Sequence, residues 1–220
     1  MLIGPNAGQA LDLYIHRLPP ALLLTLAVTV AAVAMGLVIG LLLAFMRVSS
    51  IQPVAETARW IIIVGRATPL PPVLLLTYFA ILSFGLKIEP WMSGAIGLGL
   101  NLGPYMAELF RSGIEAVPKG VIEAAEALGL SGLLVRRRVV IPIALRIMLP
   151  AIGQLTVGTL LNSAFVSQVA TRDITGMSRN IINDLASPEL WFVVAFTYFA
   201  IAFPLSRGLS FLERRMMVIS

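Results

Sequence analysis

Residues 118–131 read Pro118-Lys119-Gly120-Val121-Ile122-Glu123-Ala124-Ala125-Glu126-Ala127-Leu128-Gly129-Leu130-Ser131. Pro118 and Gly120 predict a turn, and the Glu/Ala-rich residues 121–128 are good helix formers. Gly129 suits the left-handed position that ends a helix, and Ser131 can cap the helix that follows. Because a helix this short is marginal alone, we expect a partner or the rest of the chain to hold it. From this stretch alone, a helix that docks on another protein and an incidental surface helix both remain open.

The rest of the chain is strongly apolar. Of its 220 residues, 58% are hydrophobic and 12% are charged, and the mean hydropathy is +0.93. A chain with so few polar residues cannot cover a water-exposed surface, so the composition indicates a protein dissolved in a bilayer. Five runs carry no charge: 18–46, 67–86, 90–107, 147–171 and 190–206. Each is close to or above the roughly 17–25 residues that a spanning helix needs. We therefore expect an all-α membrane protein with five transmembrane helices in one domain, residues 1–220.

The distribution of positive charge predicts the orientation. The net charge of +5 is compatible with nucleic-acid binding, but the Lys and Arg residues cluster in alternate loops. The first loop, the third loop and the C-terminal end hold most of them: Arg47, Arg59, Lys119, Arg136, Arg137, Arg138, Arg146, Arg207, Arg214 and Arg215. Basic residues mark cytoplasmic loops, so five spans place the N-terminus outside and the C-terminus in the cytoplasm. We expect the run 136–138 to face anionic membrane lipid, and we expect no nucleic-acid partner.

Several classes of site are excluded by composition. The chain has no Cys and a single His, His16. This excludes disulfides, thiolate catalysis and Cys- or His-rich metal sites. Residues 1–16 lack a basic leader region, and the apolar run after them is too long for a signal-peptide core, so we expect a retained first span.

Glycine and proline positions predict how the helices pack and break. Gly36 and Gly40 lie four residues apart in the first span and would let another helix approach closely. An equally good alternative is that they are ordinary glycines of a membrane helix without a special packing role. Pro69, Pro71 and Pro72 favour a broken or re-entrant start to the second span, which begins properly near residue 71 or 72. A long helical stretch is expected over 132–167.

Polar residues in the third span, about 91–114, fall in register. Asn101, Tyr105 and Glu108 are spaced by four and three residues and share one helix face. Arg66 and Glu108 are ionisable groups in or beside apolar segments, where charge is usually paired or functional. Both are therefore candidates for lining a translocation path. The alternative for Glu108 is a simple ion pair with Arg111 near the cytoplasmic boundary.

Several motifs in this order resemble the permeases of polar-amino-acid ABC importers of the histidine, glutamate, glutamine, arginine and opine type. They are Glu123-Ala124-Ala125 with Gly129, Ile141-Pro142, Leu149-Pro150 with Gly153-Gln154, Arg66-Ala67-Thr68-Pro69-Leu70, the segment from Asn101 to Arg111, and Leu212-Glu213-Arg214-Arg215. The likeness runs from about residue 21 to 215. The chain departs from it at Ala67, where the family usually has Gly, and at Leu161-Asn162-Ser163-Ala164, where it commonly has Lys-Asp-Thr-Ser.

The resemblance implies a type I ABC importer permease fold in a multi-pass protein of the bacterial inner membrane. It implies partners: a cytoplasmic ABC ATPase dimer, a second permease (a homodimer or a heterodimer), and an extracytoplasmic solute-binding protein. The cytoplasmic loop, about 115–138, would couple to the ATPase through Glu123, Ala124, Ala125 and Gly129. The path for the solute would include Arg66, Asn101, Tyr105, Glu108, Asn162 and Ser163.

The function implied is import of a polar amino acid or an amino-acid-derived solute, such as a basic amino acid or an opine. No Gly-x-x-x-x-Gly-Lys-Ser/Thr loop occurs, so the chain is expected to be no enzyme and to hold no cofactor, with ATP-Mg bound by the separate ATPase. Two alternatives remain open. One is an ion-driven secondary transporter, against which the lack of an inverted repeat argues. The other is a non-transporting membrane scaffold that recruits a cytoplasmic protein.

Overall fold

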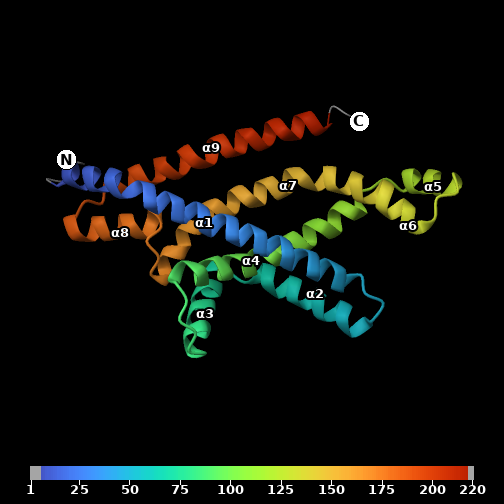
Figure 1. The fold of residues 1–220 in the computed structure, drawn as a ribbon, viewed down its shortest axis with the longest axis horizontal. Coiled ribbons are helices and arrows are strands. Elements are labelled where there is room, and N and C mark those ends of the chain that lie inside the picture. Colours follow the sequence, from blue (N-terminus) through green and yellow to red (C-terminus); the bar gives the residue numbers. More distant parts are fainter. Residues whose placement is uncertain (1–5, 218–220) are drawn as a thin grey trace.

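The structure, a computed structural model, describes residues 6–217, with side chains described for residues 6–211. All regular elements in this part are helical: α1 (Ala7–Arg47), α2 (Gln52–Ala67), α3 (Leu70–Ser83), α4 (Pro90–Glu115), α5 (Lys119–Ala127), α6 (Gly132–Val135), α7 (Ile141–Asn162), α8 (Ile174–Leu185) and α9 (Leu190–Met217). A π-helical turn (Arg136–Val140) joins α6 to α7, and a 3-10 stretch (Ser163–Val169) follows α7. The molecule is elongated, with α8 and the N-terminus at one end and α5 and α6 at the other (Figure 1).

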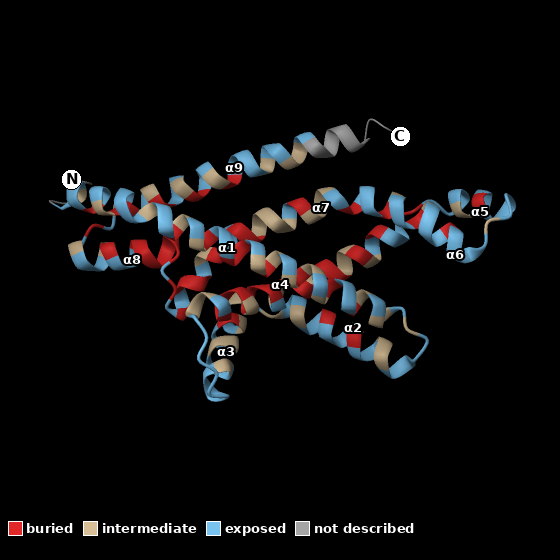
Figure 2. Cartoon of the chain, viewed as in Figure 1, coloured by how far each residue is buried: buried red, intermediate tan, exposed pale blue. Residues whose placement is uncertain are grey.

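Within the described residues, three helical stretches are long and apolar enough to cross a membrane: α1, the continuous stretch Gly132–Val169, and α9. The pair α2 and α3 can form a fourth span, because the two helices meet at a bend of 112°. The third predicted span, α4, has 26 residues but is not among them. It lies in the middle of the bundle with half of its residues buried (Figure 2), and it contains several glycines and polar residues that lower its hydropathy. The count of five spans stays a prediction.

The close approach predicted from glycine spacing occurs between α1 and α4. A Cβ added at Gly40 would lie 2.5 Å from the Met106 Cβ and 3.1 Å from the backbone nitrogen of Ala107. A Cβ at Gly36 would lie 2.7 Å from the Leu102 side chain. The two helices therefore touch nearly backbone to backbone along this seam, as small residues in membrane helices allow. Helix α4 is the central element of this part of the bundle, since α1, α2, α3 and α7 all pack on it.

The predicted break at the prolines is confirmed. Helix α2 ends at Ala67, Thr68 and Pro69 are extended, and α3 begins at Leu70. The start lies at Leu70 rather than at Pro71 or Pro72, because proline fits the first turn of a helix, where its missing N–H is not needed. The 112° bend then turns α3 away from the long axis of the bundle (Figure 1).

The short helix α5 ends as the sequence predicts. Gly129 adopts φ +81°, the left-handed region. The Gly129 N–H donates to the Glu126 carbonyl at 2.9 Å, and the Leu130 N–H donates to the Ala125 carbonyl at 3.3 Å. These two bonds form a Schellman motif. The expectation for Ser131 is wrong in part: it immediately precedes α6, but its side chain makes no capping hydrogen bond.

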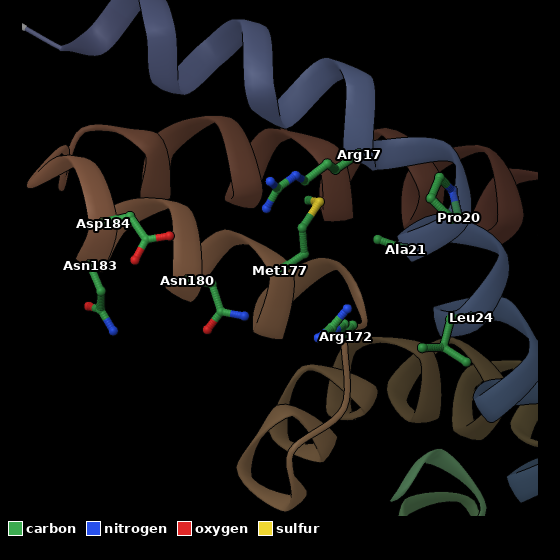
Figure 3. Close-up of a pocket in the computed structure, with 9 residues that line it drawn as sticks. All are labelled: Arg17, Pro20, Ala21, Leu24, Arg172, Met177, Asn180, Asn183 and Asp184. Atoms are coloured by element: carbon green, nitrogen blue, oxygen red, sulfur yellow. The ribbon is translucent and has the colours of Figure 1, made fainter. Parts of the chain in front are cut away.

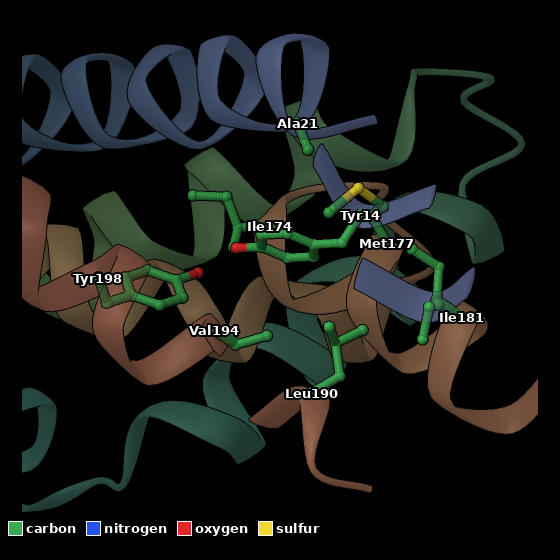
Figure 4. Close-up of a cluster of buried hydrophobic side chains, with 9 residues drawn as sticks. Tyr14, Ala21, Ile174, Met177, Ile181, Leu190, Val194 and Tyr198 are labelled. Carbon is green, nitrogen blue, oxygen red and sulfur yellow. The ribbon is translucent and has the colours of Figure 1, made fainter. Parts of the chain in front are cut away.

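Helix α8 lies between the last two charge-free runs, 147–171 and 190–206, and was not predicted from the sequence. The Asp173 carboxylate caps it by accepting from the Gly176 N–H at 3.2 Å and the Thr175 N–H at 3.4 Å. Its apolar residues, Ile174, Met177 and Ile181, pack with α1 and α9 in a buried cluster (Figure 4). The helix is amphipathic, and its outer face carries polar side chains.

Candidate functional site

A cavity of about 430 Å³ lies between the α2–α3 bend, α4 and α7. Its lining residues are Arg66, Ala67, Thr68, Pro69, Leu70, Leu98, Asn101, Leu102, Tyr105, Gln154, Leu155, Gly158, Thr159 and Asn162. Four of the six residues expected on a solute path are therefore together in one cavity: Arg66, Asn101, Tyr105 and Asn162. The other two, Glu108 and Ser163, do not line it.

Asn101 and Tyr105 connect α4 to the bend. The last carbonyls of a helix lack partners within the helix, and here α4 supplies donors to two backbone carbonyls beside the break. The Tyr105 hydroxyl donates to the Arg66 carbonyl at 3.0 Å, and the Asn101 Nδ2 donates to the Thr68 carbonyl at 3.4 Å. The predicted polar face of α4 thus stabilises the broken segment, and Tyr105 also places its ring 5.8 Å from the Arg66 guanidinium.

Glu108 serves mainly as an ion-pair partner of Arg111. Its carboxylate accepts from Arg111 at 2.6 Å and 3.2 Å, in a bidentate arrangement. The Arg66 Nη1 lies 3.9 Å from the same carboxylate, at the limit of an ion pair. The Arg66 side chain remains 45% exposed, so it stays available to a ligand. Among the described residues that line this cavity, Arg66 is the one with an ionisable Lys, Arg, His, Asp or Glu side chain.

Asn162 and Ser163 face different surroundings although they are adjacent. Asn162 ends α7 and lines the cavity, with no side-chain hydrogen bond to any residue in the range 6–211. Ser163 is 1% exposed, and its hydroxyl donates to the Leu160 carbonyl at 2.6 Å. The chain tightens into the 3-10 stretch at this point, which turns Ser163 into the protein interior. Its placement fits packing rather than contact with a solute in this cavity.

The lining residues that were not predicted from the sequence include three polar or small residues of α7: Gln154, Gly158 and Thr159. A signal was present, because residues 154, 158 and 162 are spaced by four and share one face of a helix. Gly158 leaves open space, since a Cβ placed there would meet no atom within 4 Å. This face of α7 forms one wall of the cavity.

The second predicted site, on α5, lies at the far end of the molecule (Figure 1). Glu123, Ala124 and Gly129 are exposed. Ala125 is 7% exposed and packs with Val117 and Val135 in the cluster that anchors α5 to the membrane helices. The helix is therefore held by the rest of the chain, and Ala125 lies on its inner side rather than on the surface.

Comparison with known proteins identifies the family. Residues 36–218 match the family described as binding-protein-dependent transport system inner membrane component. The chain is 34% identical over 194 residues to the nopaline transport system permease protein NocM of Agrobacterium fabrum, covering 83% of this chain and 80% of that protein. It is 34% identical over 199 residues to the glutamine transport system permease protein GlnP of Escherichia coli K12, covering 89% and 91%.

Solved structures agree with this match. The crystal structure of an amino acid ABC transporter with histidines has a chain that is 36% identical, with a TM-score of 0.85, covering 94% of this chain and 95% of that one. An inward-facing MetNI methionine ABC transporter has a TM-score of 0.72 at 19% identity, covering 93% and 96%, and this second likeness shows the fold alone. The all-helical architecture is that of a type I ABC permease. The chain therefore belongs to the binding-protein-dependent transport system inner membrane component family, the transmembrane permease subunits of ABC importers.

Proposed function

We propose that this chain imports a polar amino acid or an amino-acid-derived solute as one permease of an ATP-driven importer in the bacterial inner membrane. One observation carries the proposal: the polar cavity between the α2–α3 bend, α4 and α7, which gathers Arg66, Gln154 and Asn162. A solute that crosses a membrane needs polar partners that are weak enough to release it. The cavity offers one guanidinium and several neutral side chains, which meets this need.

The charge of the cavity favours some solutes over others. Arg66 provides a guanidinium for the solute carboxylate, the anion for which its planar donors are best suited. Among the described residues, no Asp or Glu lines the cavity, so the extra cationic group of a basic amino acid would meet no counter-charge there. Neutral amino acids and amino-acid derivatives without a second cationic group suit it better.

ATP hydrolysis by the partner would be coupled to the permease through α5. The exposed Glu123 and Ala124 face away from the cluster that anchors the helix, while Ala125 holds it from within. A thin helix of this kind fits a groove on another protein. We propose that a cytoplasmic ATPase dimer receives it, that the permease pairs with a copy of itself or a second permease, and that an extracytoplasmic binding protein delivers the solute. The N-terminus is then outside and the C-terminus is cytoplasmic.

Uptake by proteoliposomes tests the solute class. The chain is assembled with the ATPase and binding protein of its own transport system, and uptake of radiolabelled glutamine, glutamate, nopaline and arginine is compared. We expect Arg66→Gln to lower uptake of the preferred solute several-fold, and the charge-keeping control Arg66→Lys to retain more of it. A preference for arginine, or unchanged uptake by Arg66→Gln, would contradict the proposed role of the cavity.

A further inference from the structure

A cluster of four charged side chains lies beside the cavity, and we call it the charge cluster: Arg66, Glu108, Arg111 and Glu115. Arg66 comes from the last turn of α2, and the other three come from the C-terminal part of α4. Of these four, only Arg66 is among the residues that line the cavity. The two guanidiniums balance the two carboxylates, so the way in which they pair decides whether Arg66 has charge to offer a solute.

The pairing within the charge cluster is unequal. Arg111 Nε donates to Glu108 Oε2 at 3.2 Å and Arg111 Nη2 donates to Glu108 Oε1 at 2.6 Å, so one guanidinium occupies both oxygens. The remaining nitrogen, Nη1, donates to the Glu115 carboxylate. Bidentate pairs of this kind are among the stronger polar contacts in proteins. Arg66 Nη1, in contrast, lies 3.9 Å from Glu108 Oε1, beyond hydrogen-bond distance. Arg111 therefore satisfies Glu108, and Arg66 remains available to another partner.

The end of α2 is fixed against α4, so the backbone of Arg66 stays close to Glu108. A Cβ added at Gly65 would lie 2.5 Å from the Pro104 Cγ, which shows that the two helices touch here. The Tyr105 hydroxyl donates to the Arg66 carbonyl at 3.0 Å, one turn before Glu108 on α4. The freedom that remains is in the Arg66 side chain, which is 45% exposed and can direct its guanidinium either into the cavity or toward Glu108.

Glu108 is the carboxylate in a position to compete with a solute for Arg66. Among the described residues, it is the one acidic side chain within 4.0 Å of the Arg66 guanidinium. Asp184, by comparison, lines a larger groove of about 730 Å³ between α8 and the first part of α1 (Figure 3). That groove has no lining residue in common with the cavity around Arg66. If Arg111 were removed, Arg66 would be the nearest guanidinium left to pair with Glu108.

We propose that Arg111 is a positioning residue for solute binding, because it occupies the Glu108 carboxylate and thereby leaves the Arg66 guanidinium for the carboxylate of the solute. The inference rests on the proposed function, in which Arg66 binds that carboxylate. Without Arg111, an internal carboxylate takes the place of the solute on Arg66. Arg111 does not line the cavity, so its effect on the solute passes through Arg66.

A double-mutant cycle between Arg66 and Arg111 tests this mechanism. The chain is assembled in proteoliposomes with the ATPase and a saturating amount of the binding protein of its own transport system. The probe is the radiolabelled solute that the wild type imports fastest among glutamine, glutamate, nopaline and arginine, and uptake is divided by the amount of assembled transporter. We expect Arg111→Gln to lower uptake about threefold or more. In the Arg66→Gln background the same substitution should cause no further loss. Equal fractional losses in both backgrounds would show that Arg111 acts independently of Arg66 and would overturn the proposal.

Removal of the competing carboxylate provides a second readout. Glu108→Gln combined with Arg111→Gln leaves no carboxylate at position 108 to pair with Arg66, so uptake per assembled transporter should return close to the wild-type level. This recovery should disappear when Arg66→Gln is added. If Arg111→Gln does not assemble, Arg111→Lys takes its place in the cycle, because Lys keeps the charge but cannot bind both carboxylate oxygens in the same way. A smaller loss is then expected, again only while Arg66 is present.

The matched control is Arg59→Gln on α2. Arg59 lies 3.6 Å from Glu56, in a pair with the same spacing of three residues as Glu108 and Arg111, and its loss should leave uptake unchanged. The outcomes separate the two proposals. If Arg66→Gln itself leaves uptake unchanged, the proposed role of the cavity fails. If Arg66→Gln lowers uptake while Arg111→Gln behaves like the control, the proposed function stands and this inference is wrong.

Discussion

Replacement of Gly129 by Val isolates the role of the α5 end in coupling. Gly129 has φ +81°, and a side chain in the left-handed region costs about 1–2 kcal/mol. A Cβ at this position would meet no atom within 4 Å, so the whole cost arises in the backbone. A cost of this size changes the population of the capped conformation by about 5–30-fold. Because α5 has only nine residues, its C-terminal end should be displaced or disordered in the variant.

The assay compares ATP hydrolysis with solute uptake in proteoliposomes. We expect Gly129→Val to insert normally and to hydrolyse ATP, while the amount of solute moved per ATP falls. Gly120→Val is the matched control, because it adds the same side chain to α5 at a position with ordinary φ and open surroundings. Wild-type coupling in Gly129→Val, or equal loss in both variants, would refute a docking role for this end of α5.

Three further predictions concern the fold, the pathway and the orientation. Burial raises the pKa of the Asp173 carboxyl to about 6 from 3.8, so its ionised form is disfavoured in the folded chain. Stability should fall by up to about 3 kcal/mol as the pH rises from about 4 to 6. Asp173→Asn, which keeps a capping side chain, should flatten this dependence in thermal unfolding. If the substitution leaves the dependence of stability on pH unchanged, the Asp173 carboxyl is not the cause of that dependence. Asn162→Ala should lower uptake or change the preference among solutes with ATPase assembly intact, whereas Glu108→Gln, which weakens the Arg111 pair, should reduce the yield of folded protein more. If instead Glu108→Gln lowers uptake and Asn162→Ala reduces the yield of folded protein, Glu108 would act on the solute path and Asn162 in packing. Single cysteines at Ser50, Ser131 and Ala186, all exposed, can be treated with an impermeant thiol reagent. Only the last should react from outside, and labelling at position 131 would invert the orientation.

Features that depend on local backbone conformation could be predicted from the sequence, because the residues that determine them are close together in the chain. The left-handed Gly129, the break before Leu70 and the small-residue seam at Gly36 and Gly40 each follow from the conformational limits of glycine and proline. All three occur in the structure. Each needed only neighbours along the chain for its prediction.

Features set by tertiary packing were not readable in this way. Helix α8 lies among Thr, Arg and Asp residues that read as a loop, and its stability depends on burial against α1 and α9. Ser163 turns inward because the helix tightens after Asn162, a change that spacing alone does not reveal. Burial of α4 at the centre of the bundle likewise explains why its hydropathy is low for a spanning helix. The cavity joins Arg66 to Asn162 across nearly half of the chain, so only the fold brings them together.

The most direct test of the account is solute uptake under defined energy sources. Purified chain is reconstituted either alone or with the ATPase of its transport system, and the solute-binding protein is supplied on the opposite side of the membrane. The account predicts that the ATPase co-purifies stoichiometrically and that uptake requires both ATP and the binding protein. Uptake driven by an ion gradient in the isolated chain, or recruitment of the ATPase without any uptake, would contradict it.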